Sequence, residues 1–315
     1  MRPARPALGI DLGGTKIEAA LLASDGSQTW HQRVATPAGD YGATVAVLAA
    51  LVARARTAAA VPFSIGVGTP GAVAASGLMK NCNSTCLNGM PLQADLETAF
   101  GQPVVLANDA NCLALSEATD GAGAGAAVVF AAILGTGAGA GIAVQGRVLQ
   151  GPHRLAGEWG HNPLPWAEAG RDPLFDCYCG QRGCIETLVS GSGLARDHGH
   201  VTGQLLAGED IVRLAGAGDE ACRASLDRHA RRLAQALAAV INLLDPDVIV
   251  LGGGLSRLSH LYEQVPALWS PWIFGAGSDA VRTRLLPARH GDASGVRGAA
   301  WLGRAAGIEA TAPLR

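Results

Sequence analysis

Three cysteines lie within eight positions of the sequence, at Cys177, Cys179 and Cys184, in a chain that has 7 cysteines among 315 residues. Thiolates at this spacing can bind a metal ion, and the glycines between them allow the loop to wrap around it. His161, the nearest preceding histidine, would complete the Cys₃His set of a structural zinc site. The alternative is three reduced thiols without a metal. Two other histidines compete for the fourth position: His153 and His198.

A carboxylate stands directly before a glycine turn near the N-terminus, in the order Asp11, Leu12, Gly13, Gly14, Thr15, Lys16. Glycine amides can approach the oxygens of a phosphate, and the threonine hydroxyl adds a hydrogen-bond donor. The carboxylate of Asp11 can hold Mg²⁺, directly or through water. The segment therefore predicts a phosphate site, and the alternative is an ordinary tight hairpin.

Two later turns are also rich in glycine. Gly135, Thr136 and Gly137 follow an apolar run, as the first turn does, so two such tips facing a cleft would clamp phosphates. A third turn follows the short apolar run 248–251, and its backbone could admit an adenine or a ribose. This third turn consists of Gly252, Gly253 and Gly254.

Asp109 stands where the apolar run 104–107 gives way to helix-forming residues. Aspartate often caps the first turn of a helix at such a place. The functional alternative is a general base that accepts the proton of a hydroxyl group during phosphoryl transfer. We favour the base, because two phosphate-binding turns are expected elsewhere in the chain.

The elements around these residues alternate between strand and helix patterns, which is typical of an α/β protein. The first two glycine turns lie at the tips of predicted hairpins, so the chain is expected to consist of two halves of related design, with a cleft between them. The boundary is expected at residues 121–125. Hairpins are predicted at 8–23 and 128–144, further strands at 63–68, 104–107 and 248–251, and helices at 43–60, 110–119, 226–244 and 298–306.

The composition argues against several classes of protein. A net charge of -2 and a pI near 6.4 provide no basic surface for nucleic acid or an acidic membrane. The sequence shows no secretory leader and no apolar run of the roughly 18 residues that a membrane span needs. An odd number of cysteines, three of them crowded together, favours a reducing compartment over a disulfide framework. We therefore expect a cytoplasmic protein that acts on small molecules.

Six motifs in order resemble those of the ROK family of sugar kinases (repressors, open reading frames, kinases), and the resemblance covers nearly the whole chain. The motifs are IDLGGTK (10–16), GTPG (68–71), NDANC (108–112), LGTGAGAG (134–141), AGEWGH (156–161) and CYCGQRGCIE (177–186).

The resemblance implies an actin-like ATPase (ribonuclease H-like) fold with ATP and sugar in a cleft between two α/β domains. The domains would be 1–120 and 121–297, the second containing a zinc loop (161–184), and a C-terminal helix (298–315) would cross back to the first. The resemblance also suggests a homodimer.

The family motifs imply roles for individual residues. Asp109 would be the catalytic base, Asp11 would help to hold Mg²⁺, and the three turns would contact ATP. One ring nitrogen of His161 would face zinc, bound with Cys177, Cys179 and Cys184, and the other would meet a sugar hydroxyl. The implied sugar contacts are Asn83, Asn108, Glu158, His161 and Glu186.

Within the family, the segments NSTCLNG (83–89), EWGHNPLPW (158–166) and HGDASGVRGAAWL (290–302) resemble bacterial fructokinases. The expected reaction is phosphorylation of D-fructose to fructose 6-phosphate, with mannose, glucose or N-acetylglucosamine as alternatives. Cys86 departs from the tryptophan frequent in those enzymes, which is expected to reshape the pocket wall. A sugar-sensing repressor of the same family would need a DNA-binding domain ahead of the first glycine turn, where 12 residues leave no room.

Overall fold

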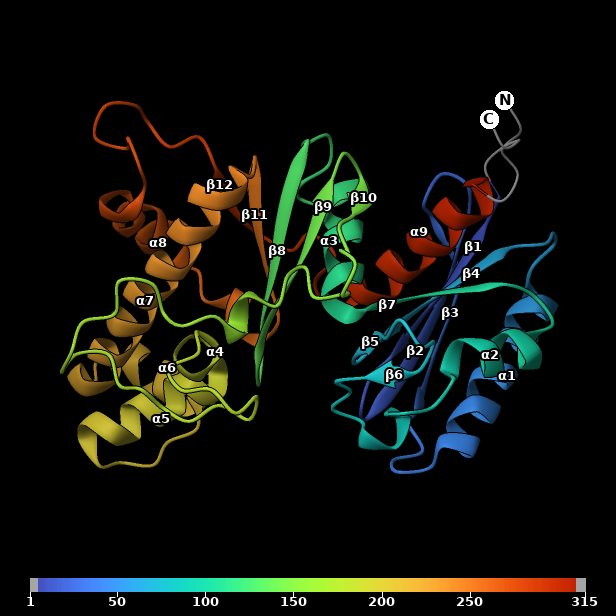
Figure 1. Ribbon diagram of the computed structural model, residues 1–315, viewed down its shortest axis with the longest axis horizontal. Coiled ribbons are helices and arrows are strands. Elements are labelled where there is room, and N and C mark those ends of the chain that lie inside the picture. The colour runs from blue at the N-terminus through green and yellow to red at the C-terminus, as the bar shows by residue number, and fades with distance from the viewer. Residues whose placement is uncertain (1–4, 310–315) are drawn as a thin grey trace.

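The computed structural model describes residues 5–309, which form two α/β halves, each built on a five-stranded sheet (Figure 1). The first sheet has the order β3 (Gln28–Ala35), β2 (Lys16–Leu22), β1 (Ala7–Leu12), β4 (Ser64–Thr69), β7 (Val104–Asn108). The second has the order β10 (Arg147–Val148), β9 (Ala138–Val144), β8 (Val128–Leu134), β11 (Val248–Gly252), β12 (Arg284–Pro287). The two orders are equivalent, which confirms the prediction of two related halves.

In each sheet the central strand comes first along the chain. It pairs antiparallel with the second strand to form the predicted hairpin, and parallel with the fourth strand. Both hairpins turn at glycine: the amide of Gly13 donates to the carbonyl of Lys16, and the amide of Gly135 donates to the carbonyl of Gly137, each at 3.0 Å. A two-stranded ribbon, β5 (Ala72–Val73) with β6 (Met79–Lys80), lies beside the first sheet.

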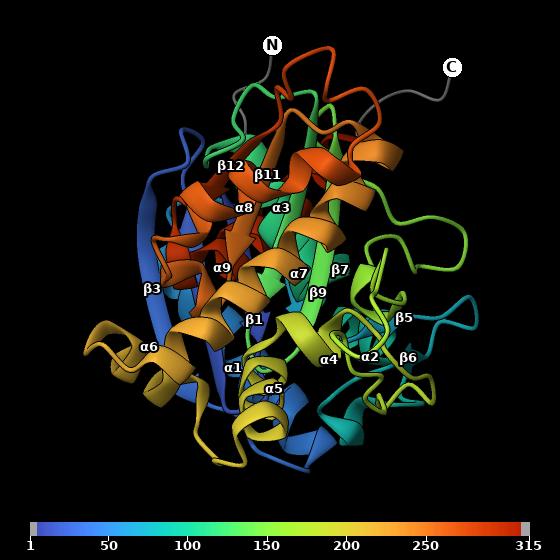
Figure 2. The same cartoon turned by 90° about the vertical axis from the view of Figure 1, so that its left-hand side faces the viewer.

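Helices bury the outer faces of both sheets. In the first half α1 (Tyr41–Ala58) and α2 (Leu92–Phe100) pack on the sheet with apolar side chains. In the second half α7 (Glu220–Leu244) and α8 (Leu261–Trp269) lie over the sheet (Figure 2). Three shorter helices adjoin α7: α4 (Glu186–Val189), α5 (Gly191–Thr202) and α6 (Gly208–Gly216). Among residues 5–309, no helix is long and apolar enough to cross a membrane.

Two helices lie between the sheets, α3 (Asp109–Thr119) and α9 (Ser294–Glu309) (Figure 1). Leu113 and Ala114 of α3 pack on the second sheet, whereas α9 packs on β1 and β4 of the first. The two helices approach so closely that a Cβ added at Gly298 would lie 1.7 Å from the carbonyl oxygen of Cys112. Helix α9 begins four residues before its predicted start, and the expected residues 310–315 lie outside the described part of the chain.

A long connection of little regular structure joins β10 to α4 and carries several predicted site residues. A buried ion-pair network holds it against α7: the guanidinium groups of Arg231 and Arg232 donate to Asp172 at 2.7 Å and 2.8 Å. A buried carboxylate needs such partners to offset its lost hydration, so the network fixes where the connection lies.

Candidate functional site

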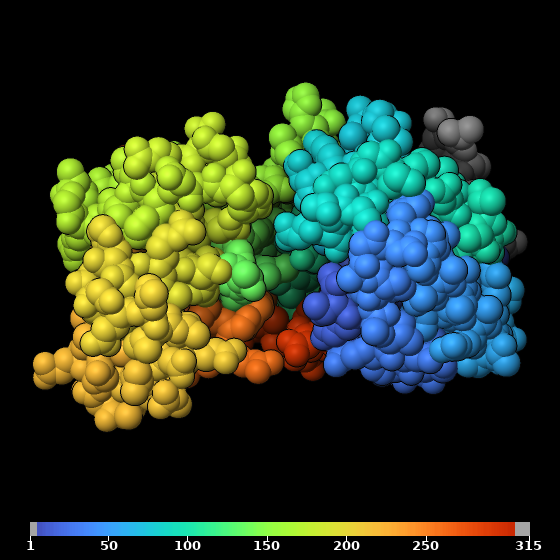
Figure 3. All heavy atoms as spheres, turned by 90° about the horizontal axis from the view of Figure 1, so that it is seen from below, coloured from blue at the N-terminus to red at the C-terminus, as the bar shows by residue number. Residues whose placement is uncertain are grey.

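A cleft of about 1340 Å³ opens between the two halves, and Figure 3 shows the surface hollowed there. The fold brings to it predicted site residues that lie far apart in the sequence. Those that line it are Asn83, Asn108, Asp109, Gly135, Thr136, Gly137, Glu158, His161, Cys179 and Glu186.

The first glycine turn lies beside this lining. A Cβ added at Gly14 would lie 3.6 Å from the hydroxyl of Ser84, the neighbour of Asn83. Lys16 lies 4.0 Å from the carboxylate of Glu18. The third turn packs behind the second hairpin, where a Cβ at Gly253 would lie 2.6 Å from the carbonyl oxygen of Leu134. The structure thus brings the first two turns near one space and sets the third behind it.

Asp109 is the first residue of α3, but it does not cap that helix. The cap is Asn108, whose side-chain oxygen accepts from the amide of Asn111 at 2.9 Å. One oxygen of Asp109 accepts from the amide of Ala110 at 2.8 Å, and the side chain opens into the cleft. The carboxylate therefore stays available for a ligand, while Asn108 keeps its side-chain NH₂ group as a donor.

Burial and neighbouring carboxylates raise the pKa of two acids, Asp11 and Asp109. Burial in the walls of the cleft raises the pKa of Asp109, and the negative charge of Glu158 adds to this. Burial, followed by the charge of Asp109, raises the pKa of Asp11 to about 7. Closely spaced acids in a cleft are typical of catalytic and cation-binding sites, because a bound cation relieves their repulsion.

Glu186, one of the predicted sugar contacts, also contacts the second glycine turn. It begins α4, and one of its oxygens accepts from the amide of Ala138 at 2.9 Å. A Cβ at Gly137 would lie 2.5 Å from that oxygen, so the turn and the carboxylate fit only with glycine there. Sequence reasoning assigned Glu186 to the sugar alone, and no local pattern signals its contact with a strand 48 residues away.

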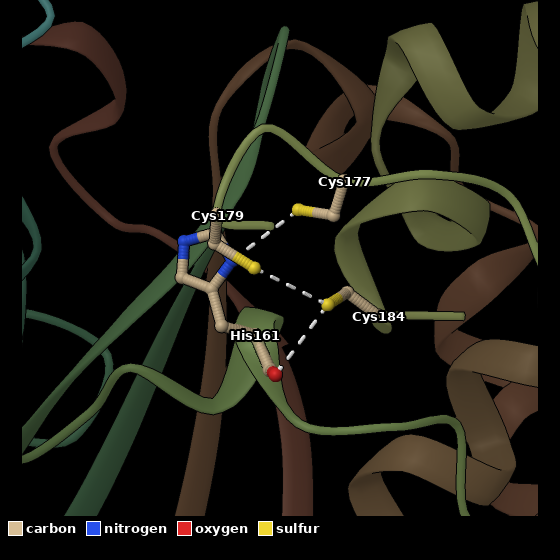
Figure 4. Close-up of side chains that lie close together, drawn as sticks. All are labelled: His161, Cys177, Cys179 and Cys184. Carbon is tan, nitrogen blue, oxygen red and sulfur yellow. Dashed lines mark hydrogen bonds between the residues drawn. The ribbon is translucent and has the colours of Figure 1, made fainter. Parts of the chain in front are cut away.

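The four predicted metal ligands converge (Figure 4). One ligand atom from each of His161, Cys177, Cys179 and Cys184 lies within 4.8 Å of all the others. Nδ1 of His161 is 3.6 Å from Sγ of Cys177, and the sulfurs of Cys179 and Cys184 are 3.7 Å apart. Tetrahedral zinc with bonds of about 2.0 to 2.3 Å has edges of about 3.5 to 3.8 Å, so these two separations, with a Cys₃His set of donors, suit that ion. Burial raises the pKa of the Cys184 thiol to about 12, which a bound cation would reverse.

The second ring nitrogen of His161 faces a residue that sequence reasoning missed. Nε2 lies 3.0 Å from the hydroxyl of Tyr178, and the two rings meet edge to face with centroids 5.2 Å apart. Tyr178 also lines the cleft. The only sequence signal was an aromatic residue placed between two thiols.

Cys86, the position expected to reshape the pocket wall, is not itself among the residues that line the cleft. Its side chain packs against the core of the first half, and Cys82 and Thr85 line the cleft instead.

Two sheets of the same topology, a cleft between them and paired glycine turns define the class of protein as an actin-like, ribonuclease H-like α/β fold. The chain belongs to the ROK family, whose model matches residues 7–306.

The chain is 38% identical over 299 residues to N-acetyl-D-glucosamine kinase of Photobacterium profundum, covering 93% of this chain and 98% of the relative. Among solved structures, ROK hexokinase from Thermus thermophilus has a TM-score of 0.84 with 32% identity, covering 96% of this chain and 99% of that one. A ROK family glucokinase from Streptomyces griseus, in complex with glucose and AMPPNP, has a TM-score of 0.75 with 29% identity, covering 95% and 99%. The comparisons confirm the resemblance to ROK-family sugar kinases. They do not support the closer resemblance to bacterial fructokinases, since these relatives are not fructokinases.

Proposed function

We propose that the protein transfers the γ-phosphoryl group of ATP to the primary hydroxyl of a sugar, with N-acetyl-D-glucosamine as the leading candidate. The observation that carries the proposal is the carboxylate of Asp109, which does not cap α3 and opens into the cleft between a glycine turn and the predicted sugar contacts. The choice of sugar is supported by the kinase that shares 38% identity over 93% of the chain.

Asp109 accepts the proton of the sugar hydroxyl while the oxygen of that hydroxyl bonds to the γ-phosphorus. The bond between the γ-phosphorus and the β–γ bridging oxygen breaks, which releases ADP. The raised pKa of Asp109 makes this carboxylate a better proton acceptor than an aspartate with the ordinary pKa. Asp11 would hold Mg²⁺, and the ion would neutralise part of the phosphate charge. The amides of the first two turns bind phosphate oxygens. Most of the catalysis is positioning and charge stabilisation, as phosphoryl transfer requires.

The sugar binds between residues of both halves. Asn83 and the NH₂ group of Asn108 donate to hydroxyls from one side, and Glu158 accepts from hydroxyls on the other. One oxygen of Glu186 accepts from the amide of Ala138, and the other lies 3.9 Å from Sγ of Cys177. That second oxygen serves the sugar once the thiol is engaged with the metal. A side chain that contacts both the second turn and the sugar sets their separation.

His161, Cys177, Cys179 and Cys184 hold zinc in this proposal. The ion would fix the position of the loop 177–184 relative to the helical turn that contains His161. With Nδ1 turned toward the thiols, the proton of the neutral ring resides on Nε2, which can donate to a sugar oxygen. The thiols thus orient a sugar contact without touching the sugar.

D-Fructose is the second candidate, because three segments of the sequence resemble bacterial fructokinases, among them residues 158–166 around the site. The two sugars differ where an N-acetyl group needs room beside carbon 2. A coupled assay of ADP release over N-acetylglucosamine, fructose, mannose and glucose separates them by kcat/KM. We expect N-acetylglucosamine to rank first. Fructose ranking first would support the motif likeness, and no turnover of any sugar would contradict the kinase proposal.

A homodimer stays a prediction. Light scattering of the purified protein is expected to give twice the 31.9 kDa mass of one chain. The mass of a single chain at micromolar concentration would contradict it.

A further inference from the structure

We propose that Tyr178 takes the place of a sugar hydroxyl on His161 while the site is empty, so that a sugar must displace the phenol in order to bind. Tyr178 would then set the affinity of the site for its sugar. The inference rests on the proposed function, because it takes His161 as a sugar contact.

The two ring nitrogens of His161 face different surroundings. Nδ1 lies 3.6 Å from Sγ of Cys177, on the side of the candidate metal site. Nε2 lies 3.0 Å from the phenol oxygen of Tyr178, on the side of the cleft. When Nδ1 faces a cation, Nε2 carries the proton and donates to the phenol oxygen.

The phenol oxygen lies where a sugar oxygen would have to be. A hydrogen bond to a ring N–H needs an oxygen roughly 2.7 to 3.2 Å away and nearly in line with that bond. Two oxygens cannot both meet this condition on one N–H group. Nε2 of His161 therefore cannot bind a sugar hydroxyl while it keeps its contact with Tyr178.

The side chain of Tyr178 is free to leave while its backbone stays in place. It is 77% exposed, and its described ring contact is the single edge-to-face meeting with His161. The loop backbone is held separately: the amide of Cys177 donates to the carbonyl of Gln181 at 2.9 Å, and the amide of Gly180 donates to the carbonyl of Cys177 at 3.0 Å. Displacement thus requires a side-chain rotation and the loss of one hydrogen bond, and it leaves the thiols undisturbed.

The test uses Tyr178→Phe, which keeps the ring and removes the oxygen. The dissociation constants of N-acetylglucosamine and fructose are measured by calorimetry on the metal-replete protein. We expect the dissociation constant of the bound sugar to be about 2- to 10-fold lower in the variant than in wild type. This is the range given by the loss of one competing neutral hydrogen bond. Metal content and the KM for ATP should not change.

The matched control is Tyr41→Phe, which removes a phenol that donates to Asp95 at 2.5 Å in the first half and leaves the cleft untouched. Its sugar affinity should equal that of wild type. A second readout is the ¹⁵N shift of Nε2 in His161. Wild type and Tyr178→Phe should differ without sugar and coincide when saturated with it.

The outcomes separate the two proposals. Weaker or unchanged sugar binding in Tyr178→Phe, with normal binding in wild type, would overturn the displacement and make Tyr178 a sugar contact or a bystander. Histidine shifts that stay different at saturation would overturn it as well. A wild-type protein that neither binds nor phosphorylates any of the four sugars would overturn the proposed function, and this inference with it.

Discussion

The two halves have the same strand order, yet their central strands carry opposite kinds of side chain at the same position. Asp11 on β1 lies in register with Gly68 of β4, and Ile133 on β8 lies in register with Gly252 of β11. Each stands two positions before the glycine of its turn. A carboxylate beside the cleft in one half is thus an apolar side chain in the other.

This difference shows how one scaffold supports two tasks. The first half supplies two carboxylates: Asp11 near the end of β1 and Asp109 directly after β7. The pKa of both is raised. The second half supplies contacts that position the site: Glu186 accepts from the second turn, and the four candidate metal ligands converge around the loop that precedes Glu186. The topology places a turn at the cleft in both halves, and the side chains decide what each turn does.

The largest effect is expected from removing the proposed base in the first half, Asp109. Asp109→Asn should lower kcat by about 10²- to 10⁴-fold, because an amide cannot accept the proton. Sugar affinity and folding should persist, since Asn108 remains the cap of α3. Steady-state kinetics beside sugar calorimetry gives the answer. A kcat close to that of wild type would leave Asp109 without a catalytic role.

In the second half, the thiol loop is expected to govern sugar binding. Cys179→Ser should raise the KM for sugar by about 10- to 100-fold, the range found when groups that orient a ligand are lost. The KM for ATP should change less, because the thiol loop reaches only the second glycine turn, and does so through Glu186. Elemental analysis should show zinc in wild type and less in the variant.

Cys86→Ser is the control for this loss, because it removes a thiol that packs on the first-half core outside the cleft. It should retain both zinc and sugar affinity. Fully active protein that contains no zinc would defeat the metal proposal and leave His161 as an ordinary polar side chain of the cleft.

Sequence patterns predicted the hairpins, their glycine turns and the convergence of His161 with the three thiols, because local periodicity and ligand spacing encode them. They did not predict that α3 packs on the second sheet, and the return of α9 to the first sheet was expected only from the family resemblance. This arrangement depends on a close tertiary approach at Gly298, which no local pattern signals. They also left open whether Asp109 was a cap, which depends on the geometry of Asn108.

A smaller effect should distinguish the two turns. Gly137→Ala places a Cβ 2.5 Å from the oxygen of Glu186, so the carboxylate or the turn must move. We expect kcat/KM for the sugar to fall about tenfold, below the 10²-fold that a displacement of about 1 Å can cost. In the first turn, Gly14→Ala meets nothing closer than the Ser84 hydroxyl at 3.6 Å, so its loss should be smaller. Equal losses in the two variants would mean that Glu186 does not hold the second turn.

The smallest expected effect concerns how stability depends on pH in the second half. His229 of α7 is buried, and its Nε2 donates to the carbonyl of Val189 at 2.9 Å, at the end of the helix that Glu186 begins. Burial lowers its pKa to about 4 from the ordinary 6.5. Between these values the unfolded chain binds a proton that the folded protein does not, so this contribution to stability is present above pH 6.5 and is lost as the pH falls toward 4. From pH 7.5 to 5.5 the free energy of unfolding should fall by about 1 kcal/mol.

His229→Gln keeps a donor for Val189 but does not titrate. Urea unfolding of this variant should therefore show a correspondingly weaker dependence on pH over the same range. If wild type and variant lose stability equally between pH 7.5 and 5.5, His229 does not titrate as its burial implies, and the acid sensitivity of the second half must come from other groups.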